Sequence, residues 1–240
     1  MLTAIAIVSS APVMVPELAG AAAAEVAGLR EAVFAAASAL PGRWIAVGVG
    51  PAGSSDTVVA PTAGGTFAGY GADVRVALAP GGGGTTDMLP LCALVAGWVR
   101  RQVAPDATVE VRAYAGDHTV EVAVDLGRAL RVEIDAQPEP VGVLVVADGA
   151  HTLTPTAPGG FDPGAAADQA ALDEALARGD VAALRRLAPT VVGRVAYQVL
   201  AGLAEAGPVS ASELHRSAPY GVGYFVGRWH PAAAQRVSDR

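Results

Sequence analysis

Residues 140–162 constrain the fold more than any other stretch of the sequence. Residues 141–147 form a continuous apolar run rich in β-branched side chains, which predicts a strand buried on both faces, as in the middle of an α/β sheet. The run ends at Asp148, where Gly149 permits a sharp turn, and His151 follows. Because open α/β sheets place ligands at the carboxyl ends of such strands, this turn is the first candidate functional site.

Other apolar runs alternate with helical segments along the chain. Strands are expected over residues 2–8, 44–49, 74–78, 108–114 and 220–229, and an irregular segment over 57–70. Helices are expected over residues 16–40, 87–103, 119–130, 164–178, 181–206 and, as a short piece, 211–216. This alternation predicts the α/β class, with a mostly parallel or mixed central sheet and helices on both faces.

No linker or run of charges divides the 240 residues. We therefore expect one domain over residues 1–240, with 231–240 as a flexible tail. The run of glycines at 81–84 precedes an expected helix, an arrangement that can bind anions, but it lacks the lysine of a phosphate-binding loop. A flexible loop is the alternative interpretation.

Charge and cysteine content exclude several classes of protein. The net charge is -7 and no basic stripe is present, which argues against binding to nucleic acid or to an anionic membrane surface. Cys92 is the single cysteine, so an internal disulfide and a cysteine-rich metal cluster are excluded. No stretch of about 20 uncharged apolar residues occurs, and the apolar start lacks a basic segment, so we expect a cytoplasmic protein.

Two histidines follow aspartates at the ends of expected strands. His118 comes directly after Asp117, and His151 comes three residues after Asp148. Imidazole is the usual acid and base near neutral pH, and a nearby carboxylate would orient its ring. His118, His151 and Asp148 are therefore the candidate catalytic residues. In the alternative interpretation, Asp148 closes a turn and His151 is satisfied by backbone.

Several further polar residues lie on loops that follow expected strands, and one begins the strand expected over 220–229. The candidate substrate-binding positions are Ser10, Ser54, Ser55, Asp56 and Tyr220. For the serines, capping of loop backbone is the alternative. Two histidines and an aspartate could hold iron in principle, but no H-x-H, H-E-x-x-H or C-x-x-C spacing and no G-x-S-x-G elbow is present.

Four segments spread over the chain share motif patterns with one family. They are the opening AIAIVSSAPVMVPEL, the Asp117-His118 pair, ADGAHTLTPTAPGGFDP around His151, and APYGVGYFVGRW near the C-terminal end. Through these segments the chain resembles the class III extradiol ring-cleavage dioxygenase family, in its B-type branch, which is related to the Memo-like proteins. The resemblance implies the α/β fold of that family.

The family holds a ferrous ion with two histidines and a glutamate, and a separate histidine acts as acid and base on a catecholic substrate. The resemblance implies His151 in the acid/base role and His118 as a second active-site histidine. Ser10 stands where the first metal histidine belongs, residues 49–51 hold no histidine at the second position, and the carboxylate has no clear counterpart within 220–229. No metal ligand is therefore assigned, and Fe(II) is implied by the resemblance alone.

Three functions from different classes remain open. The first is a family member with a lost or altered iron site and a retained small-molecule cleft, which is the hypothesis we favour. The second is an active non-haem Fe(II) dioxygenase on a catecholic or other small aromatic substrate. The third is a non-catalytic binding protein, or one chain of an enzyme that needs a partner chain. The alanine-rich helices, whose flat faces pack closely, also suggest a homodimer.

Overall fold

The computed structural model describes residues 1–83 and 88–232. Its main sheet has seven strands in the order β3-β6-β2-β7-β1-β9-β8, and β4 and β5 form a separate two-stranded sheet. The strands are β1 (Leu2–Val8), β2 (Arg43–Gly50), β3 (Thr57–Val59), β4 (Gly64–Thr66), β5 (Arg75–Ala77), β6 (Thr108–Ala115), β7 (Val141–Val146), β8 (Pro208–Ser217) and β9 (Tyr224–Pro231). The central strands β6, β2, β7 and β1 run parallel, while β3 and β9 are antiparallel to their neighbours.

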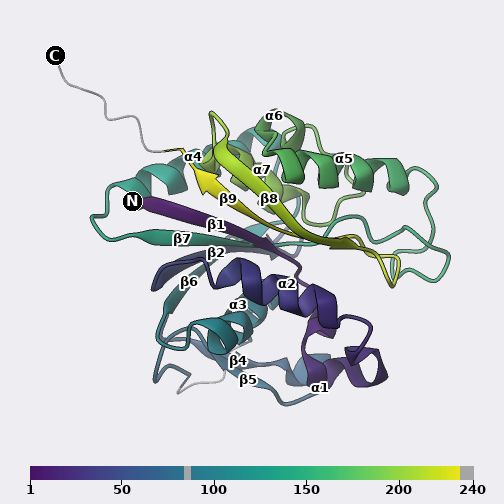
Figure 1. Cartoon of the computed structure of the whole chain (residues 1–240), viewed down its shortest axis with the longest axis horizontal. Helices are drawn as coiled ribbons and strands as arrows, with labels where there is room; N and C mark the ends of the chain where they lie inside the picture. The colour runs from purple at the N-terminus through teal and green to yellow at the C-terminus, as the bar shows by residue number, and fades with distance from the viewer. Residues whose placement is uncertain (84–87, 233–240) are drawn as a thin grey trace.

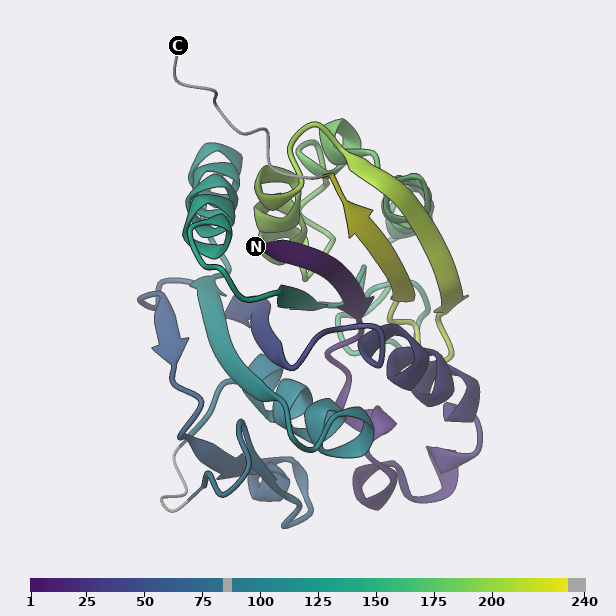
Figure 2. The ribbon, with the colours of Figure 1, turned by 60° about the vertical axis from the view of Figure 1, so that its left-hand side comes forward.

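Helices cover both faces of the main sheet (Figure 1). The α-helices are α1 (Pro16–Ala19), α2 (Ala27–Ala37), α3 (Leu91–Val103), α4 (Val120–Asp135), α5 (Ala165–Arg178), α6 (Val181–Leu184) and α7 (Arg194–Leu203), and 3-10 turns span Pro12–Met14, Gly20–Ala23 and Phe67–Tyr70. Helices α2 and α3 lie on one face of the sheet, and α4, α5 and α7 lie on the other (Figure 2). One apolar core lies under each set of helices. The predicted fold class, a mixed α/β sheet between two helical layers, is confirmed.

The central strand β7 is buried along its whole length, as the apolar run predicted. It pairs in parallel with β1 on one side and with β2 on the other, so that Val145 lies between Ile7 and Val47. Alternate residues of β7 enter the two cores, which is why both of its faces are apolar. The ends of β1, β2, β6 and β7 consequently open onto one edge of the sheet.

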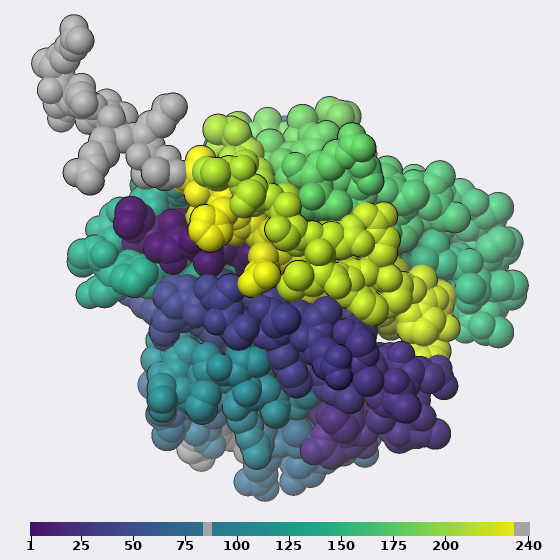
Figure 3. Space-filling view, in the orientation of Figure 1, coloured from purple at the N-terminus to yellow at the C-terminus, as the bar shows by residue number. Residues whose placement is uncertain are grey.

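The strands at the β8 end of the sheet run antiparallel to their neighbours and are partly exposed. Strand β9 pairs with β1 and with the edge strand β8. In the space-filling view, β8 and β9 reach the surface between α2 below and the segment of α5 and α6 above (Figure 3). The buried side chains of β9 and the mixed exposure of β8 fit a strand inside the sheet and a strand at its edge, respectively.

Two of the predicted long helices are each broken into pieces. The helix expected over 16–40 is interrupted at Gly20, whose positive φ of 53° ends α1, and a 3-10 turn precedes α2. The helix expected over 181–206 is split into α6 and α7. Pro189 lies in the intervening segment, and Val191 and Gly193 there pair with the backbone that follows β7. This pairing, together with the absence of an N–H group on Pro189, interrupts the helix that the amino-acid composition predicts here.

Other expectations about strands are corrected. The short helix expected over 211–216, with His215 at its end, is wrong: these residues belong to β8, which pairs with β9, and His215 bonds to the Ser217 hydroxyl. The irregular segment expected over 57–70 contains β3 and β4. The strand expected over 74–78 is present as β5, but it pairs with β4 outside the main sheet. Cross-strand pairing, which a local pattern does not contain, decides each case.

Parts of three expectations lie outside the described residues. Residues 84–87 include the end of the glycine run and the expected start of the helix at 87. Residues 88–90 are described and are not helical, so the helix begins at Leu91, later than expected. The tail expected over 231–240 is described only as far as 232, and β9 includes Pro231. In the described ranges, no helix has both the length and the apolar character needed to cross a bilayer.

Helices α4 and α7 approach each other through two glycines. A Cβ atom at Gly127 would lie 2.0 Å from the Val199 carbonyl oxygen, and one at Gly202 would lie 2.0 Å from the Val124 carbonyl oxygen. Both distances are far below van der Waals contact, and the atoms concerned belong to helical backbone that has little freedom to move. The two helices therefore touch backbone to backbone at this point.

We predict that Gly127→Ala destabilises the fold, although alanine favours a helix by about 1 kcal/mol. The added methyl group must push α4 away from α7, and overpacking of this kind costs ~1–3 kcal/mol. Gly69→Ala is the matched control, because a Cβ there meets no atom within 4 Å. Urea unfolding should show a lower midpoint for Gly127→Ala only. An unchanged midpoint would contradict the close contact of the helices.

Candidate functional site

The carboxyl edge of the parallel strands carries most of the predicted site residues. Ser9 and Ser10 follow β1, His118 follows β6, and Asp148 and His151 follow β7. These segments share the edge because the strands that deliver them are parallel. Their side chains form two separate hydrogen-bonded groups, and His151 lies outside both.

The first group joins the ends of β1 and β7 through Asp148. One carboxylate oxygen accepts hydrogen bonds from the Ser9 hydroxyl (2.6 Å) and the Ser10 N–H (2.9 Å), and the other accepts from the Ser10 hydroxyl (2.6 Å). Burial raises the pKa of Asp148, and the three donors act against that rise. Ser9 is fully buried. The cluster links the ends of two neighbouring strands through hydrogen bonds in which the buried carboxylate oxygens both have partners.

The second group pairs His118 with Asp56. The His118 Nε2 and the Asp56 Oδ1 lie 2.7 Å apart, and the same oxygen accepts the N–H of Ala115 (2.8 Å). Asp56 reaches this position because β3, which begins at the next residue, pairs antiparallel with β6. The neighbouring Asp117 is exposed. The carboxylate that pairs with His118 belongs instead to Asp56, which lies 62 residues away in the sequence.

His151 stands apart from both groups. Its Nδ1 is enclosed and has no hydrogen-bond partner among the described residues, and the same holds for the Thr152 hydroxyl. The ring packs against Gly159, where a Cβ would lie 2.5 Å from Nε2, and the Gly159 N–H donates to the His151 carbonyl. The backbone carbonyl of His151 is therefore satisfied within its own loop, while the imidazole nitrogen is not.

Gln169 positions the turn between Asp148 and His151, and sequence reasoning missed it. Its Oε1 accepts the N–H of Ala150 (2.8 Å), and its Nε2 donates to the Asp173 carboxylate (2.8 Å). The amide occupies a slot between Gly149 and Gly223, where a Cβ on either glycine would lie about 2 Å from Oε1. The signal available in the sequence was spacing: Gln169 stands three and seven residues before Leu172 and Leu176, which places it on the apolar face of the helix.

The remaining predicted residues serve local structure in the contacts described. Ser54 donates to the Pro51 carbonyl (2.7 Å) and is exposed, in agreement with the loop-capping alternative. Ser55 is also exposed, and its carbonyl accepts the Thr57 hydroxyl. Tyr220 donates to Glu25 (2.9 Å), which belongs to neither of the strand-end groups.

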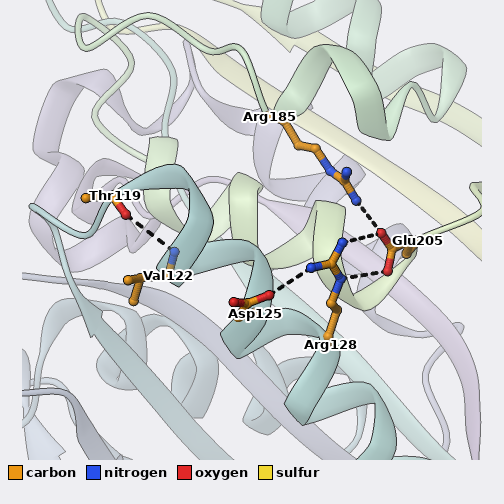
Figure 4. A network of polar contacts seen from close by, with 6 residues as sticks. All are labelled: Thr119, Val122, Asp125, Arg128, Arg185 and Glu205. Carbon is orange, nitrogen blue, oxygen red and sulfur yellow. Dashed lines mark hydrogen bonds and ion pairs between the residues drawn. The ribbon is translucent and has the colours of Figure 1, made fainter.

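Three hollows are described on the molecule. The largest, about 760 Å³, lies between α4 and α7 beside residues such as Val132 and Ala206, and a network of Arg128, Arg185 and Glu205 flanks it (Figure 4). A second, about 270 Å³, lies beside β8 and β9. The third, about 220 Å³, is lined by Asp56 and by residues of β3, β6 and α4, and so adjoins the His118 pair.

The donor atoms present do not fit the iron that the family resemblance implies. The Ser10 hydroxyl, at the first ligand position, donates its hydrogen to Asp148 rather than offering a basic nitrogen. Within residues 1–83 and 88–232, no group of three or more His, Cys, Asp or Glu side chains is arranged to hold a metal ion. The chemistry available at the edge is hydrogen bonding and proton transfer by imidazole and carboxylate.

Comparison with known proteins supports the fold. The crystal structure of the uncharacterized protein JW3007 from Escherichia coli K12 superposes with a TM-score of 0.60, covers 95% of this chain and 99% of that chain, and is 13% identical. At that identity the likeness extends to the fold alone. No protein-family model and no curated protein matches the sequence.

We predict a pH-dependent stability that originates in Asp173. Burial raises the pKa of this carboxyl from its ordinary value of 3.8 to about 6. The folded state therefore favours the protonated form, and stability is lost as the pH rises from about 4 to about 6. Solvent screening of the partly open carboxyl reduces the loss to about 1 kcal/mol. Asp173→Asn keeps an acceptor for Gln169 and removes this loss, so the variant should be the more stable protein at pH 7.

The comparison is made by urea unfolding at several pH values. The difference in unfolding free energy between Asp173→Asn and the wild-type protein should be largest above pH 6 and close to zero near pH 4. Asp106→Asn, an exposed control, should track the wild-type protein. A pH-independent difference for Asp173→Asn would refute the assignment.

Proposed function

We propose that this chain is a divergent relative of the class III extradiol ring-cleavage dioxygenases of the B type, with a lost or altered iron site and a retained small-molecule site at the strand-end edge. Motif resemblance along the sequence and the mixed α/β sheet support the proposal. The acidic charge supports a cytoplasmic protein whose partner is a small molecule rather than nucleic acid or membrane.

The observation that carries the proposal is the cluster of Ser9, Ser10 and Asp148. Ser10 stands where the resemblance expects an imidazole ligand, and both its hydroxyl and its N–H point at Asp148. A hydroxyl that donates to a buried carboxylate stabilises that carboxylate and is a poor ligand for a divalent cation in comparison with an imidazole nitrogen. The residue at the ligand position thus has a different partner within the protein.

The pair of His118 and Asp56 supplies the proton chemistry of the proposed site. In the neutral ring, a carboxylate next to Nε2 favours the tautomer that carries hydrogen there, so Nδ1 is left as the acceptor. A bound molecule with an acidic hydroxyl or ammonium group would meet a base oriented in this way.

One observation favours the second candidate, an active dioxygenase. The His151 Nδ1 has no partner in the described part of the chain, so no protein group competes for it. Because the atom is enclosed, an acid/base role on a substrate requires the surrounding loop to open. A requirement for a partner chain is the third candidate, and a homodimer is the simplest assembly. Metal content and chain composition separate the three candidates.

Iron reconstitution tests the proposal. The purified protein is incubated with ferrous iron without oxygen, freed of excess metal, and analysed for iron per chain, together with His118→Ala and His151→Ala. We expect far less than one iron per chain and no difference between the three proteins. Asp106→Asn serves as the surface control.

One iron per chain that is lost in either histidine variant would overturn the altered-site proposal and support the active dioxygenase. Size and composition of the purified protein are measured in the same preparations. A second polypeptide that co-purifies in equal amount would instead support an enzyme assembled from two kinds of chain. Neither outcome depends on knowing the substrate.

A further inference from the structure

The hollow between β3, β6 and α4 combines a polar floor with an apolar wall. Asp56, Arg112 and Tyr114 line it from the sheet side, and Glu133 lines it from α4. Its volume of about 220 Å³ lies below the range of typical ligand pockets, which indicates a small ligand. It opens beside His118 through the shared residue Asp56.

Tyr114 is the residue of this hollow that most needs a partner. Its side chain is 6% exposed and lines the hollow. Within the described ranges the Tyr114 hydroxyl makes no hydrogen bond, and its oxygen is not fully enclosed by protein atoms. Burial raises the pKa of Tyr114 to about 12, so the phenol keeps its proton at neutral pH. An accessible, neutral hydroxyl in a buried setting is a binding group.

The charges around the hollow favour a cation. Arg112 is the one guanidinium that lines it, and its Nε donates to Glu110 (2.7 Å) while its Nη2 donates to Glu133 (2.6 Å). Asp56 adds a third carboxylate, bonded through Oδ1 to the Ala115 N–H and the His118 ring. The charges that act on Tyr114 are thus three carboxylates, two of them bonded to Arg112, and one guanidinium, which gives a negative potential at this residue of the hollow.

Apolar side chains line the hollow from both α4 and β3. Leu126 and Leu130 lie one turn apart on α4 and line the hollow, and Val58 on the edge strand β3 faces the same space with 59% of its surface exposed. A large apolar side chain that stays exposed next to partly buried polar side chains can be covered by the apolar part of a ligand. The site thus has apolar side chains that can contact the hydrocarbon part of a ligand and polar side chains that can bind its positively charged group.

We propose that this hollow binds a small amphipathic amine, with its ammonium between Asp56 and the Tyr114 hydroxyl and its apolar body against Val58 and Leu126. The inference rests on the proposed function only in that both place a small-molecule site beside His118. It adds the chemical class of the ligand and its position.

Calorimetric titration with three small molecules that share a phenyl ring on a short carbon chain, but differ in charge, tests whether the hollow prefers a cation. 2-Phenylethylamine should bind saturably with one site per chain, and 2-phenylethanol and phenylacetate should bind at least about tenfold more weakly, because they lack the ammonium that the carboxylates attract. Tyr114→Phe and Asp56→Asn should each weaken the amine about tenfold. Tyr70→Phe and Asp106→Asn, which are exposed, are the matched controls.

Ala129→Phe gives an independent test that alters no polar group. Ala129 is exposed on α4 and lines the hollow, so a phenyl ring there should fill the space and abolish amine binding while the protein stays folded by circular dichroism. Absence of amine binding, equal binding of the three probes, or unchanged affinity in both Tyr114→Phe and Ala129→Phe would overturn the inference. Iron stoichiometry is a separate measurement, so failure here is distinguishable from failure of the proposed function.

Discussion

The burial of β7 on both faces is the constraint on which the rest of this structure depends. All six of its residues are enclosed between two helical layers, and β1 and β2 flank it in parallel. A strand held in this way cannot shift its register without exposing apolar side chains to water. The backbone that leaves it is therefore fixed in space, and Asp148 meets the serines that follow β1 while Val192 and Gly193 bond back to the same turn.

Two carboxylates near this edge show how differently the protein treats buried charge. Asp148 receives three hydrogen bonds from Ser9 and Ser10, whereas Asp173 receives one from Gln169, and burial raises the pKa of both. Hydroxyl donors stabilise the ionised form of Asp148 without adding positive charge to the site. The donors to Asp148 are therefore neutral groups, and they oppose the rise in its pKa that burial causes.

The features that depend on short-range pattern could be predicted from the sequence. The apolar runs predicted β1 and β7, and the alternation of runs predicted the layered α/β fold. Contacts between distant residues escaped prediction: Asp56 reaches His118 only because the three-residue strand β3 pairs with β6, and β8 forms only because β9 pairs with it. The helix break before α7 likewise depends on backbone bonds to another segment. Pairing partners and their register are non-local, and no periodicity in a single chain encodes them.

The glycine contact between α4 and α7 has a mechanical consequence. Because Gly127 and Gly202 bring the two backbones together, neither helix can tilt or slide without carrying the other along. The start of α7 holds Arg194, which reaches the carbonyl of His118 just ahead of α4. A shift of α7 would therefore carry α4 with it, and the backbone at His118 that precedes α4 would have to move as well.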